Sequence, residues 1–471
     1  MTDLGKNIFD RPVTRRQALK ALGGSVLAAA LPASASEQLL TGPSRPNIIF
    51  ILTDDHRWDA LSCMGHPFIQ TPHLDRIARE GVLFENAFVT TSLCSPSRAS
   101  FLTGQYAHTH GVVTNHTPWD NRNTTFLELL KAQGYDTAFI GKWHMPGKGL
   151  PKLRGVDHFV SFTQEGGQGV YYDCPLIIDG VESERTGKYI TEDLTDFALK
   201  FVKKRRNNPF CLYLSHKAVH FGFRPPKHLN DLYDNVDLKL PPESDTWNTM
   251  TRNHLFVGAL FPMNILYREY CETVVSVDEQ VGRILEQLEQ MNILDDTIII
   301  YAGDNGHFWG EHGLYDKRLA YEESIRIPLL VRYPGMIQDP GRRASQMILN
   351  IDLAPTILDL AGLSIPGPMQ GQSLKPTLQS AGTPGRTSWL YEHFPVFPIP
   401  IPGITAVRTD QYKYVEYQND VRPKELFDLQ ADPKEKTNII HTREGRRLIP
   451  QLKQELERLK QETGYRFLTR G

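Results

Sequence analysis

Cysteine, net charge and long apolar runs are all scarce in this chain of 471 residues. Five cysteines are too few for a disulfide scaffold in a chain of this length. A formal net charge of -2 creates no overall field that would attract nucleic acid or an acidic membrane surface. No apolar run reaches the roughly 20 residues that a membrane-spanning helix needs, so we expect no stable membrane anchor. Any specificity must therefore come from a local site.

Residues 1–35 are predicted to be an export signal rather than part of the fold. Arg15 and Arg16 precede an apolar run at 21–31, and the small residues at 33–35 form a cleavage site. The paired arginines resemble the twin-arginine leader, whose pathway exports proteins that are already folded. A disordered basic tail is the alternative. The leader predicts a periplasmic or secreted protein.

Apolar strands alternate with helical patterns over most of the chain. Continuous apolar runs at 46–53, 136–140, 210–214 and 297–301 are typical of strands that are buried on both faces. Helical spacing separates them, and its longest stretch is 264–291. This alternation predicts an α/β fold with a mostly parallel central sheet flanked by helices.

A smaller unit is expected at the C-terminal end. Residues 362–385 are rich in loop-forming residues and hold the predicted boundary between a domain at 46–365 and a subdomain at 386–471. Alternating residues at 412–417 predict a small antiparallel sheet, and 448–463 predicts a charged amphipathic helix. The subdomain should therefore be α+β.

Polar residues follow four of the predicted strands. Because ligands bind beyond the carboxyl ends of parallel strands, we expect these residues to share one site. Adjacent carboxylates repel each other unless a cation balances them, and hard oxygen ligands suit Ca²⁺ or Mg²⁺. The residues are Asp54 and Asp55, Lys142 and His144, His216 and His220, and Asp304 and Asn305.

The stretch 94–104, CSPSRASFLTG, places a thiol just before a proline and a helical pattern. Pro96 suits the first position of a helix, where its missing N–H costs nothing. Cys94 would then lie near a helix N-terminus, which favours bound anions, and Arg98 would reach the same anion from one turn further on. For a Cys–Pro pair alone, a buried thiol before a turn is the alternative.

The whole string resembles the signature of the formylglycine-dependent sulfatases, Cys-x-Pro-Ser-Arg followed by Leu-Thr-Gly. The resemblance covers residues 46–462 and implies an alkaline-phosphatase-like fold and the hydrolysis of sulfuric esters. In that family a maturase oxidises the cysteine to formylglycine, whose hydrated aldehyde is the nucleophile, so the resemblance assigns this modification to Cys94. The other matching motifs are Asp54-Asp55, GKWH at 141–144, GDNG at 303–306 and the segment around Lys317.

The resemblance also implies a role for each residue of the predicted site. The metal is usually calcium in this family, magnesium is the alternative, and no organic cofactor is expected. Three cations would balance the carboxylates and hold sulfate, while His144 and His220 would transfer protons to and from the nucleophile and the leaving alcohol. His216 competes with His220, because the family often shows Pro-His where this chain has Val219-His220. The implied metal ligands are Asp54, Asp55, modified Cys94, Asp304 and Asn305, and the implied catalytic residues are Cys94, Arg98, Lys142, His144, His220 and Lys317.

Three further segments, 167–172, 315–318 and 407–414, resemble sulfatases that act on glycosaminoglycan or mucin sugars. Among these they resemble the N-acetylglucosamine-6-sulfatases most. The resemblance implies a sulfated saccharide substrate, with 6-O-sulfated N-acetylglucosamine as the expected sugar. The loop region 152–187 and the residues around 392–393 are expected to line its pocket. The candidate contacts are Gln168, His312, Glu392 and His393.

Two other classes of function stay open from the sequence alone. An arylsulfatase, or a hydrolase of phosphate or phosphonate monoesters with the same fold, could use this site, because phosphate and sulfate share tetrahedral geometry. A sugar-binding protein without activity would result if Cys94 stayed unmodified. The intact set of metal and proton-transfer residues argues against the second alternative.

Overall fold

The central sheet of the computed structural model holds eleven strands among the residues described, which are 45–468 without 148, 205, 239, 241–262 and 396–400. Its strands are β1 (Asn47–Thr53), β2 (Val82–Phe88), β3 (Asp136–Gly141), β4 (His158–Ser161), β5 (Leu176–Ile178), β6 (Val181–Ser183), β7 (Phe210–Ser215), β8 (Thr297–Gly303), β11 (Arg326–Ile327), β12 (Leu329–Arg332) and β13 (Arg342–Leu349). Their order is β11-β2-β12-β8-β1-β7-β3-β4-β5-β6, and β13 pairs with β2. The predicted α/β fold is confirmed.

The middle of this sheet is parallel, whereas its two sides contain antiparallel pairs, with β13 parallel to β2. β8, β1, β7, β3 and β4 run parallel. On the two sides, β12 is antiparallel to β8 and β2, and β5 is antiparallel to β4 and β6. The sheet is therefore mixed, and the parallel part that the sequence predicted lies at its centre.

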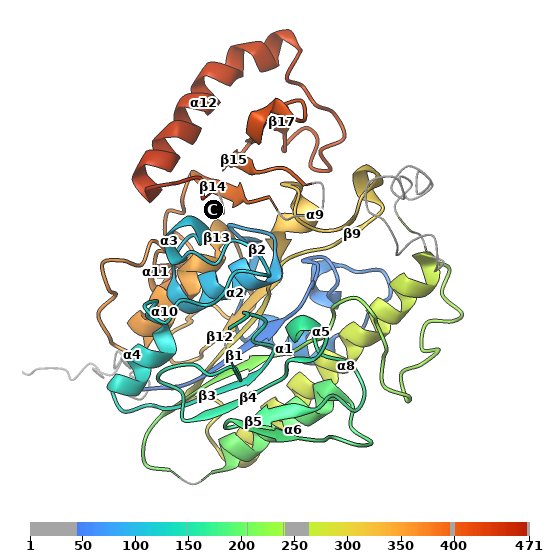
Figure 1. The fold of residues 1–471 in the computed structure, drawn as a ribbon, viewed down its shortest axis with the longest axis vertical. Helices are drawn as coiled ribbons and strands as arrows, with labels where there is room; N and C mark the ends of the chain where they lie inside the picture. The colour runs from blue at the N-terminus through green and yellow to red at the C-terminus, as the bar shows by residue number, and fades with distance from the viewer. Residues whose placement is uncertain are drawn as a thin grey trace, which may run out of the picture. The chain divides into compact units, whose positions relative to one another are not determined.

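Helices cover both faces of the sheet (Figure 1). The α-helices of the described residues are α1 (Pro72–Glu80), α2 (Cys94–Thr103), α3 (Ala107–His110), α4 (Phe126–Ala132), α5 (Gln164–Gly167), α6 (Ile190–Lys203), α8 (Met263–Gln290), α9 (Glu322–Ile325), α10 (Leu353–Leu360), α11 (Lys375–Gln379) and α12 (Arg443–Thr463), and not all of them lie on this sheet. Buried side chains of α1, α6 and α8 pack on one face, and those of α2, α4 and α10 pack on the other.

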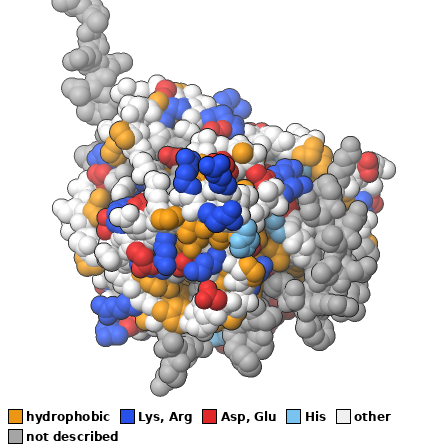
Figure 2. Space-filling model, turned by 90° about the horizontal axis from the view of Figure 1, so that it is seen from above, with side chains coloured by type: hydrophobic (Ala, Val, Ile, Leu, Met, Phe, Trp, Pro, Cys, Tyr) orange, Lys and Arg blue, Asp and Glu red, His pale blue; other side chains and the backbone are white. Residues whose placement is uncertain are grey.

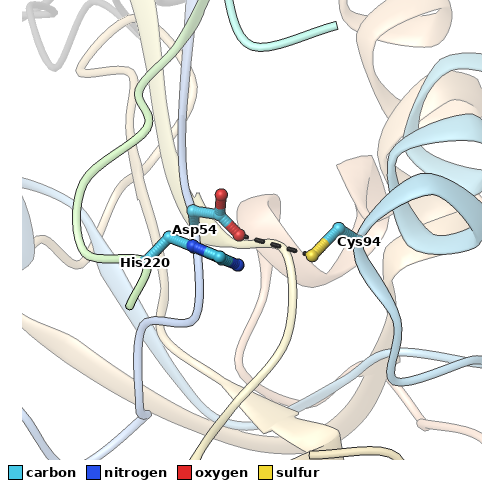
Figure 3. A group of neighbouring side chains, drawn as sticks. All are labelled: Asp54, Cys94 and His220. Carbon is cyan, nitrogen blue, oxygen red and sulfur yellow. Dashed lines mark hydrogen bonds between the residues drawn. The ribbon is translucent and has the colours of Figure 1, made fainter. Parts of the chain in front are cut away.

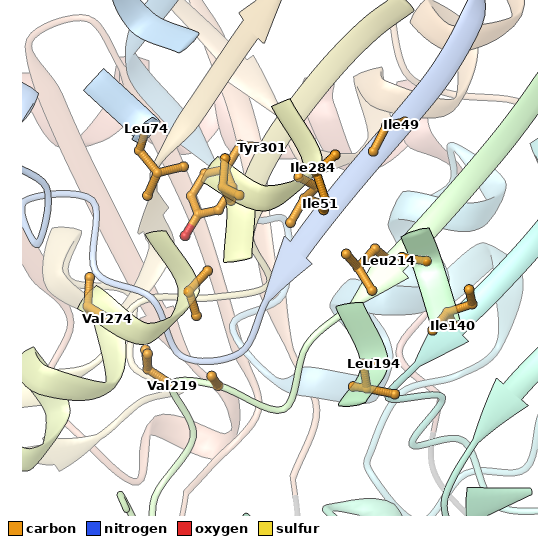
Figure 4. Close-up of a cluster of buried hydrophobic side chains, with 14 of the residues drawn as sticks. Ile49, Ile51, Leu74, Ile140, Leu194, Leu214, Val219, Val274, Ile284 and Tyr301 are labelled. Carbon is orange, nitrogen blue, oxygen red and sulfur yellow. The ribbon is translucent and has the colours of Figure 1, made fainter. Parts of the chain in front are cut away.

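Alternate residues of β1 enter two different cores, because successive side chains of a strand point to opposite faces. Ile49 and Ile51 pack with Leu74 of α1 and with α8, as Figure 4 shows. Ile48, Phe50 and Leu52 pack on the opposite side. Burial on both faces fixes β1 firmly, and with it the polar residues that follow its last position.

A second sheet of four antiparallel strands lies in the C-terminal part of the chain. It contains, in spatial order, β14 (Ser388–His393), β15 (Ile404–Thr409), β16 (Tyr412–Tyr417) and β17 (Glu425–Asp428). α12 packs against β14, β15 and β16. Figure 2 looks down on this end of the structure and shows Lys and Arg side chains gathered near its centre, with Asp and Glu among them. The predicted antiparallel sheet and helix are confirmed, although the helix begins at Arg443 rather than at residue 448.

Segment 152–187, which the sequence predicted to be irregular, contributes β4, β5 and β6 to the central sheet. These strands have only three or four residues each, too few to show an alternating pattern. A further two-stranded sheet joins β9 (Phe308–Trp309) and β10 (Tyr315–Asp316). The domain boundaries expected near 365 and 386 stay predictions.

All five cysteines are free thiols, in keeping with the low cysteine content. Among the described residues, no helix has both the length and the apolar character needed to cross a membrane. The predicted export signal at 1–35 lies outside the described residues.

Candidate active site

The parallel strands at the centre of the sheet bring the predicted residues to one edge. β8, β1, β7 and β3 are neighbours, and each is followed directly by polar residues of the predicted site. Gly141 allows the close approach of β3 to β7, since a Cβ at this position would lie 1.8 Å from the carbonyl oxygen of Ser215. Lys142 follows at once and is fully buried. We call the residues gathered here the Cys94 cluster, in which all members except the partly exposed His220 are buried. They are Cys94, Asp54, Asp55, Arg98, Lys142, His144, His220, Asp304, Asn305 and Lys317.

Cys94 is the first residue of α2, a helix in which every residue is buried. Its Sγ lies 3.6 Å from Oδ1 of Asp54, a hydrogen bond drawn as a dashed line in Figure 3. Nζ of Lys317 lies 3.3 Å from the same sulfur. Burial raises the pKa of the Cys94 thiol to about 12, in spite of the opposing charges of Lys142 and Lys317. The thiol is therefore held in its neutral form between a carboxylate and an ammonium group.

Three carboxylates of the Cys94 cluster meet in a space that suits a metal ion. Asp54, Asp55 and Asp304 each offer an oxygen, and these oxygens lie within 4.8 Å of one another. Burial, together with the charge of Asp54, raises the pKa of Asp304 to about 7. The amide oxygen of Asn305 is buried and has no hydrogen-bond partner. Asn305 adjoins the carboxylates, because its Nδ2 donates a hydrogen bond of 2.6 Å to Oδ1 of Asp55. Three carboxylate oxygens held close together, with an unpartnered amide oxygen on a neighbouring residue, fit a hard divalent cation.

Each carboxylate also faces a cation. Nε and Nη2 of Arg98 both lie 2.9 Å from Oδ2 of Asp304. Lys142 pairs with Asp54, and Lys317 pairs with Asp55. Burial alone would raise the pKa of Asp54, but the ammonium group of Lys142, with smaller contributions from His220 and Arg98, holds this pKa well below its usual value. The site therefore keeps negative and positive charges side by side in a buried environment.

Two histidines complete the Cys94 cluster. His144 adopts a positive φ of 56°, which is uncommon for a residue with a side chain, and its buried Nδ1 has no hydrogen-bond partner. His220 places Nε2 3.8 Å from Oδ2 of Asp55 and shares a group of possible ligand atoms with Asp54 and Cys94 (Figure 3). Burial lowers the pKa of both histidines, and Lys142 adds to the effect.

His216, the competitor of His220, has a different environment. Its side chain is fully buried, neither ring nitrogen has a hydrogen-bond partner, and burial lowers its pKa to about 3. It belongs to none of the possible metal-ligand groups found among the described residues. The geometry therefore brings His220, and not His216, to Cys94.

The four candidate sugar contacts lie in three different environments. Gln168 reaches the Cys94 cluster, where its Oε1 accepts a hydrogen bond from Nζ of Lys142. His312 stacks on Tyr321, lies 3.5 Å from Glu323 and lines a separate cavity of about 1030 Å³. Among the described residues, no member of the Cys94 cluster lines that cavity.

Glu392 and His393 are both buried in β14. The carboxylate of Glu392 accepts hydrogen bonds from Nδ1 and the backbone N–H of His108, at 2.7 and 3.1 Å. Burial, and beside it the charge of Arg318, lowers the pKa of His393 to about 3. The structure thus engages Glu392 with a partner inside the protein instead of leaving it open to a sugar, because a buried carboxylate requires a compensating donor.

Two buried side chains next to the site were not predicted. Ser215 accepts a hydrogen bond of 2.6 Å from Nη1 of Arg98 and so helps to orient that guanidinium group. Lys217 is almost fully buried, and burial, with the charge of Lys142, lowers its pKa to about 8. Ser215 is the last residue of β7 and Lys217 lies just beyond it, so their position at a strand end was the available indication.

Comparisons with known proteins identify the family of this chain. The family model described as Sulfatase matches residues 46–363. The chain belongs to the sulfatase family. A second model, N-sulphoglucosamine sulphohydrolase, C-terminal, matches residues 310–462 of this sulfatase.

Individual relatives agree with the family match. An N-acetylglucosamine-6-O-sulfatase of Bacteroides thetaiotaomicron is 35% identical, with 92% of this chain and 89% of that protein covered. The human N-acetylglucosamine-6-sulfatase is 31% identical, with 85% and 82% covered. A solved structure of a protein in complex with its substrate D-glucosamine-2-N,6-O-disulfate is 33% identical, has a TM-score of 0.82, and is matched over 98% of its chain and 89% of this one. The phosphonate monoester hydrolase of Agrobacterium radiobacter, at 22% identity and a TM-score of 0.75, shows only that the fold is shared.

The sulfatase is thus a sulfuric ester hydrolase with an alkaline-phosphatase-like fold. Sulfatases generally use a metal ion, and Asp54, Asp55, Asp304 and Asn305 are the residues here that fit one. A bound divalent ion would supply positive charge next to the sulfuryl oxygens. The cations Arg98, Lys142 and Lys317 pair with the carboxylates of this set.

Proposed function

We propose that this sulfatase removes the 6-O-sulfate from a terminal N-acetylglucosamine of a glycosaminoglycan or mucin chain. The observation that carries the proposal is the position of Cys94 between Asp54 and Lys317, inside a ring of buried carboxylates and cations. The names of the relatives that cover most of the chain support the choice of sugar.

Cys94 is converted to formylglycine in this proposal by a formylglycine-generating maturase, and the hydrate supplies the attacking hydroxyl group. Lys142, Lys317 and Arg98 together neutralise the charge of the sulfate, because all three cations are buried beside the nucleophile. His144 handles the proton of the hydrate. His220 gives a proton to the sugar oxygen as the S–O bond breaks, so that the alcohol leaves neutral.

The metal in this proposal is Ca²⁺, with Mg²⁺ as the alternative, held by Asp54, Asp55, Asp304, Asn305 and the modified Cys94. No organic cofactor takes part. The carboxylates and the amide oxygen are hard ligands, which supports either ion over softer metals. Glu392 has its partner in His108, and Gln168 is the candidate sugar contact that the geometry supports best.

The protein is exported in a folded state by the twin-arginine pathway, according to the same proposal. Residues 1–35 carry the sequence features of that leader. Export after folding would allow Cys94 to be modified inside the cell. The enzyme would then act on sulfated glycans in the periplasm or outside the cell.

The matured enzyme can be tested against a panel of defined esters. The panel should hold N-acetylglucosamine 6-sulfate, sugars sulfated at other positions, an aryl sulfate and a phosphonate monoester, with Cys94→Ala as the inactive control. We expect the highest kcat/KM on the 6-sulfated amino sugar. An aryl sulfate or a phosphonate ester that far outperforms every sulfated amino sugar would overturn the proposal.

A further inference from the structure

A cavity of about 610 Å³ lies next to the Cys94 cluster and reaches it through His144. Its walls come from three segments, 119–121, 143–152 without residue 148, and 162–167, which includes α5. The volume is within the range of small-molecule sites, about 300–1,000 Å³. None of the four candidate sugar contacts lines this cavity, but part of its wall comes from the region 152–187 that the sequence predicted to line the sugar pocket.

Two indole rings form part of the apolar wall of the cavity, beside Met145, Leu150 and Phe162. Trp119 and Trp143 meet edge to face, with ring centroids 5.4 Å apart. Trp143 is almost fully buried against Phe139 and Phe159, whereas Trp119 is only partly buried. The backbone N–H of Trp119 donates to the carbonyl oxygen of Pro146 and so fixes this loop to the one that follows His144. The cavity therefore has a supported aromatic surface, of the kind on which the C–H face of a sugar ring packs.

The polar part of the wall has one sign of charge. Lys152 is exposed, and no carboxylate is found among the described residues that line the cavity. Asn121 and Thr163 add neutral hydrogen-bonding groups. A cavity with an ammonium group and no acid favours a ligand that carries a carboxylate or a sulfate.

The connection to the reaction runs through His144. Gly167 lies directly over this residue, with a φ of 93°, and a Cβ at position 167 would lie 3.3 Å from Cα and Cδ2 of His144. The glycine thus lets the wall of the cavity come close to the imidazole. His144 thus belongs to the Cys94 cluster and also lines the cavity.

We infer that this cavity binds a second, anionic sugar, the one linked to the sugar that carries the scissile sulfate. The inference rests on the proposed function and narrows it. Trp119 stacks on the ring of the second sugar, and Lys152 pairs with its carboxylate or sulfate. The enzyme therefore prefers glucosamine linked to an acidic sugar, as in a glycosaminoglycan, over glucosamine linked to a neutral one.

The test compares three substrates that carry the same 6-sulfate: the monosaccharide, a disaccharide with a uronic acid neighbour and a disaccharide with a galactose neighbour. We expect the wild-type kcat/KM to be highest on the uronic acid disaccharide. Trp119→Ala should lower kcat/KM about 5- to 10-fold on both disaccharides and leave the monosaccharide unchanged. Trp119→Phe, which keeps an aromatic ring, should restore most of the loss.

Lys152→Ala should reduce only the preference for the uronic acid over galactose, and added salt should weaken the preference of the wild type in the same way. Lys203→Ala, an exposed lysine at the end of α6, is the matched control and should change nothing. Equal losses of Trp119→Ala on all three substrates, or no loss on any, would overturn the inference. A wild type that is active on the monosaccharide but no faster on the disaccharides would also overturn it. A wild type inactive on all three would overturn the proposed function itself.

Discussion

The chemistry of this sulfatase depends on a few buried charges that balance one another. Asp54, Asp55 and Asp304 would repel each other strongly in the absence of cations, because burial removes the screening of water. Arg98, Lys142 and Lys317 each pair with one of them. Substitutions that leave this set of charges unbalanced should change both metal binding and activity.

Asp304→Asn should remove one negative charge from the metal-binding oxygens. We expect the affinity for the metal to fall at least about 100-fold, and activity to fall with it. Mutating residues that only hydrogen-bond to a metal ligand already lowers metal affinity or activity about 10- to 100-fold, so the loss of a ligand should cost at least as much. Metal content by mass spectrometry and kcat measure the two effects. Asp136→Asn, at the opposite end of β3, is the control and should bind metal normally. Full activity after exhaustive chelation, with no divalent ion bound, would show that the ligand assignment is wrong.

His220→Ala should affect substrates according to their leaving groups. On a sugar sulfate we expect kcat/KM to fall about 10²- to 10⁴-fold, because the departing alkoxide needs a proton. A nitrophenyl sulfate, whose phenolate leaves readily without a proton, should lose far less. His216→Ala, measured in parallel, should lose equally on both substrates. The reverse pattern, with selective loss in His216→Ala, would assign the acid to His216.

At the scale of elements, His108 helps to tie the C-terminal helix to the catalytic part of the chain, beside Gln370, whose Nε2 donates to the same carbonyl oxygen of Thr463. Nδ1 of His108, in α3, forms a hydrogen bond with the carboxylate of Glu392 in β14. Its Nε2 lies 2.9 Å from the carbonyl oxygen of Thr463 in α12. Burial and the nearby Arg466 oppose a charge on His108, but these two acceptors raise its pKa above the ordinary value. The protonated ring therefore joins three elements.

His108 should make stability depend on pH. Its folded-state pKa is raised, so its contribution to the free energy of unfolding is complete below the unfolded pKa of about 6.5 and is lost as the pH rises through the folded value. The difference in unfolding free energy between wild type and His108→Gln, from urea denaturation, should shrink with rising pH. Glu392→Gln should abolish the same dependence. A difference that stays constant from pH about 5.5 to 9 would contradict this account.

At the scale of the whole molecule, the sequence predicted best what is encoded locally. The strands β1, β3, β7 and β8 are continuous apolar runs, and the polar residues that follow them had to meet at one edge of a parallel sheet. The short strands β4 to β6 showed no pattern. The position of Glu392 depends on His108, 284 residues away in the chain, and no local feature of the sequence contains that contact.

Export is a prediction about the full chain. Replacing Arg15 and Arg16 by lysines should keep the protein in the cytoplasm, because the twin-arginine pathway reads the arginine pair. Fractionation followed by immunoblotting measures the outcome, and the same chain with Lys20→Arg serves as a control that keeps the pair. Normal export of the double lysine variant would contradict the assignment of the pathway.

The most direct test of the account concerns Cys94 in the active, matured enzyme. Trypsin should release residues 80–98 as one peptide, which contains Cys94 as its single cysteine. Mass spectrometry should find this peptide lighter by the difference between cysteine and formylglycine, and reactive toward an aldehyde reagent. Fully active enzyme whose peptide carries only the unmodified thiol would contradict the account.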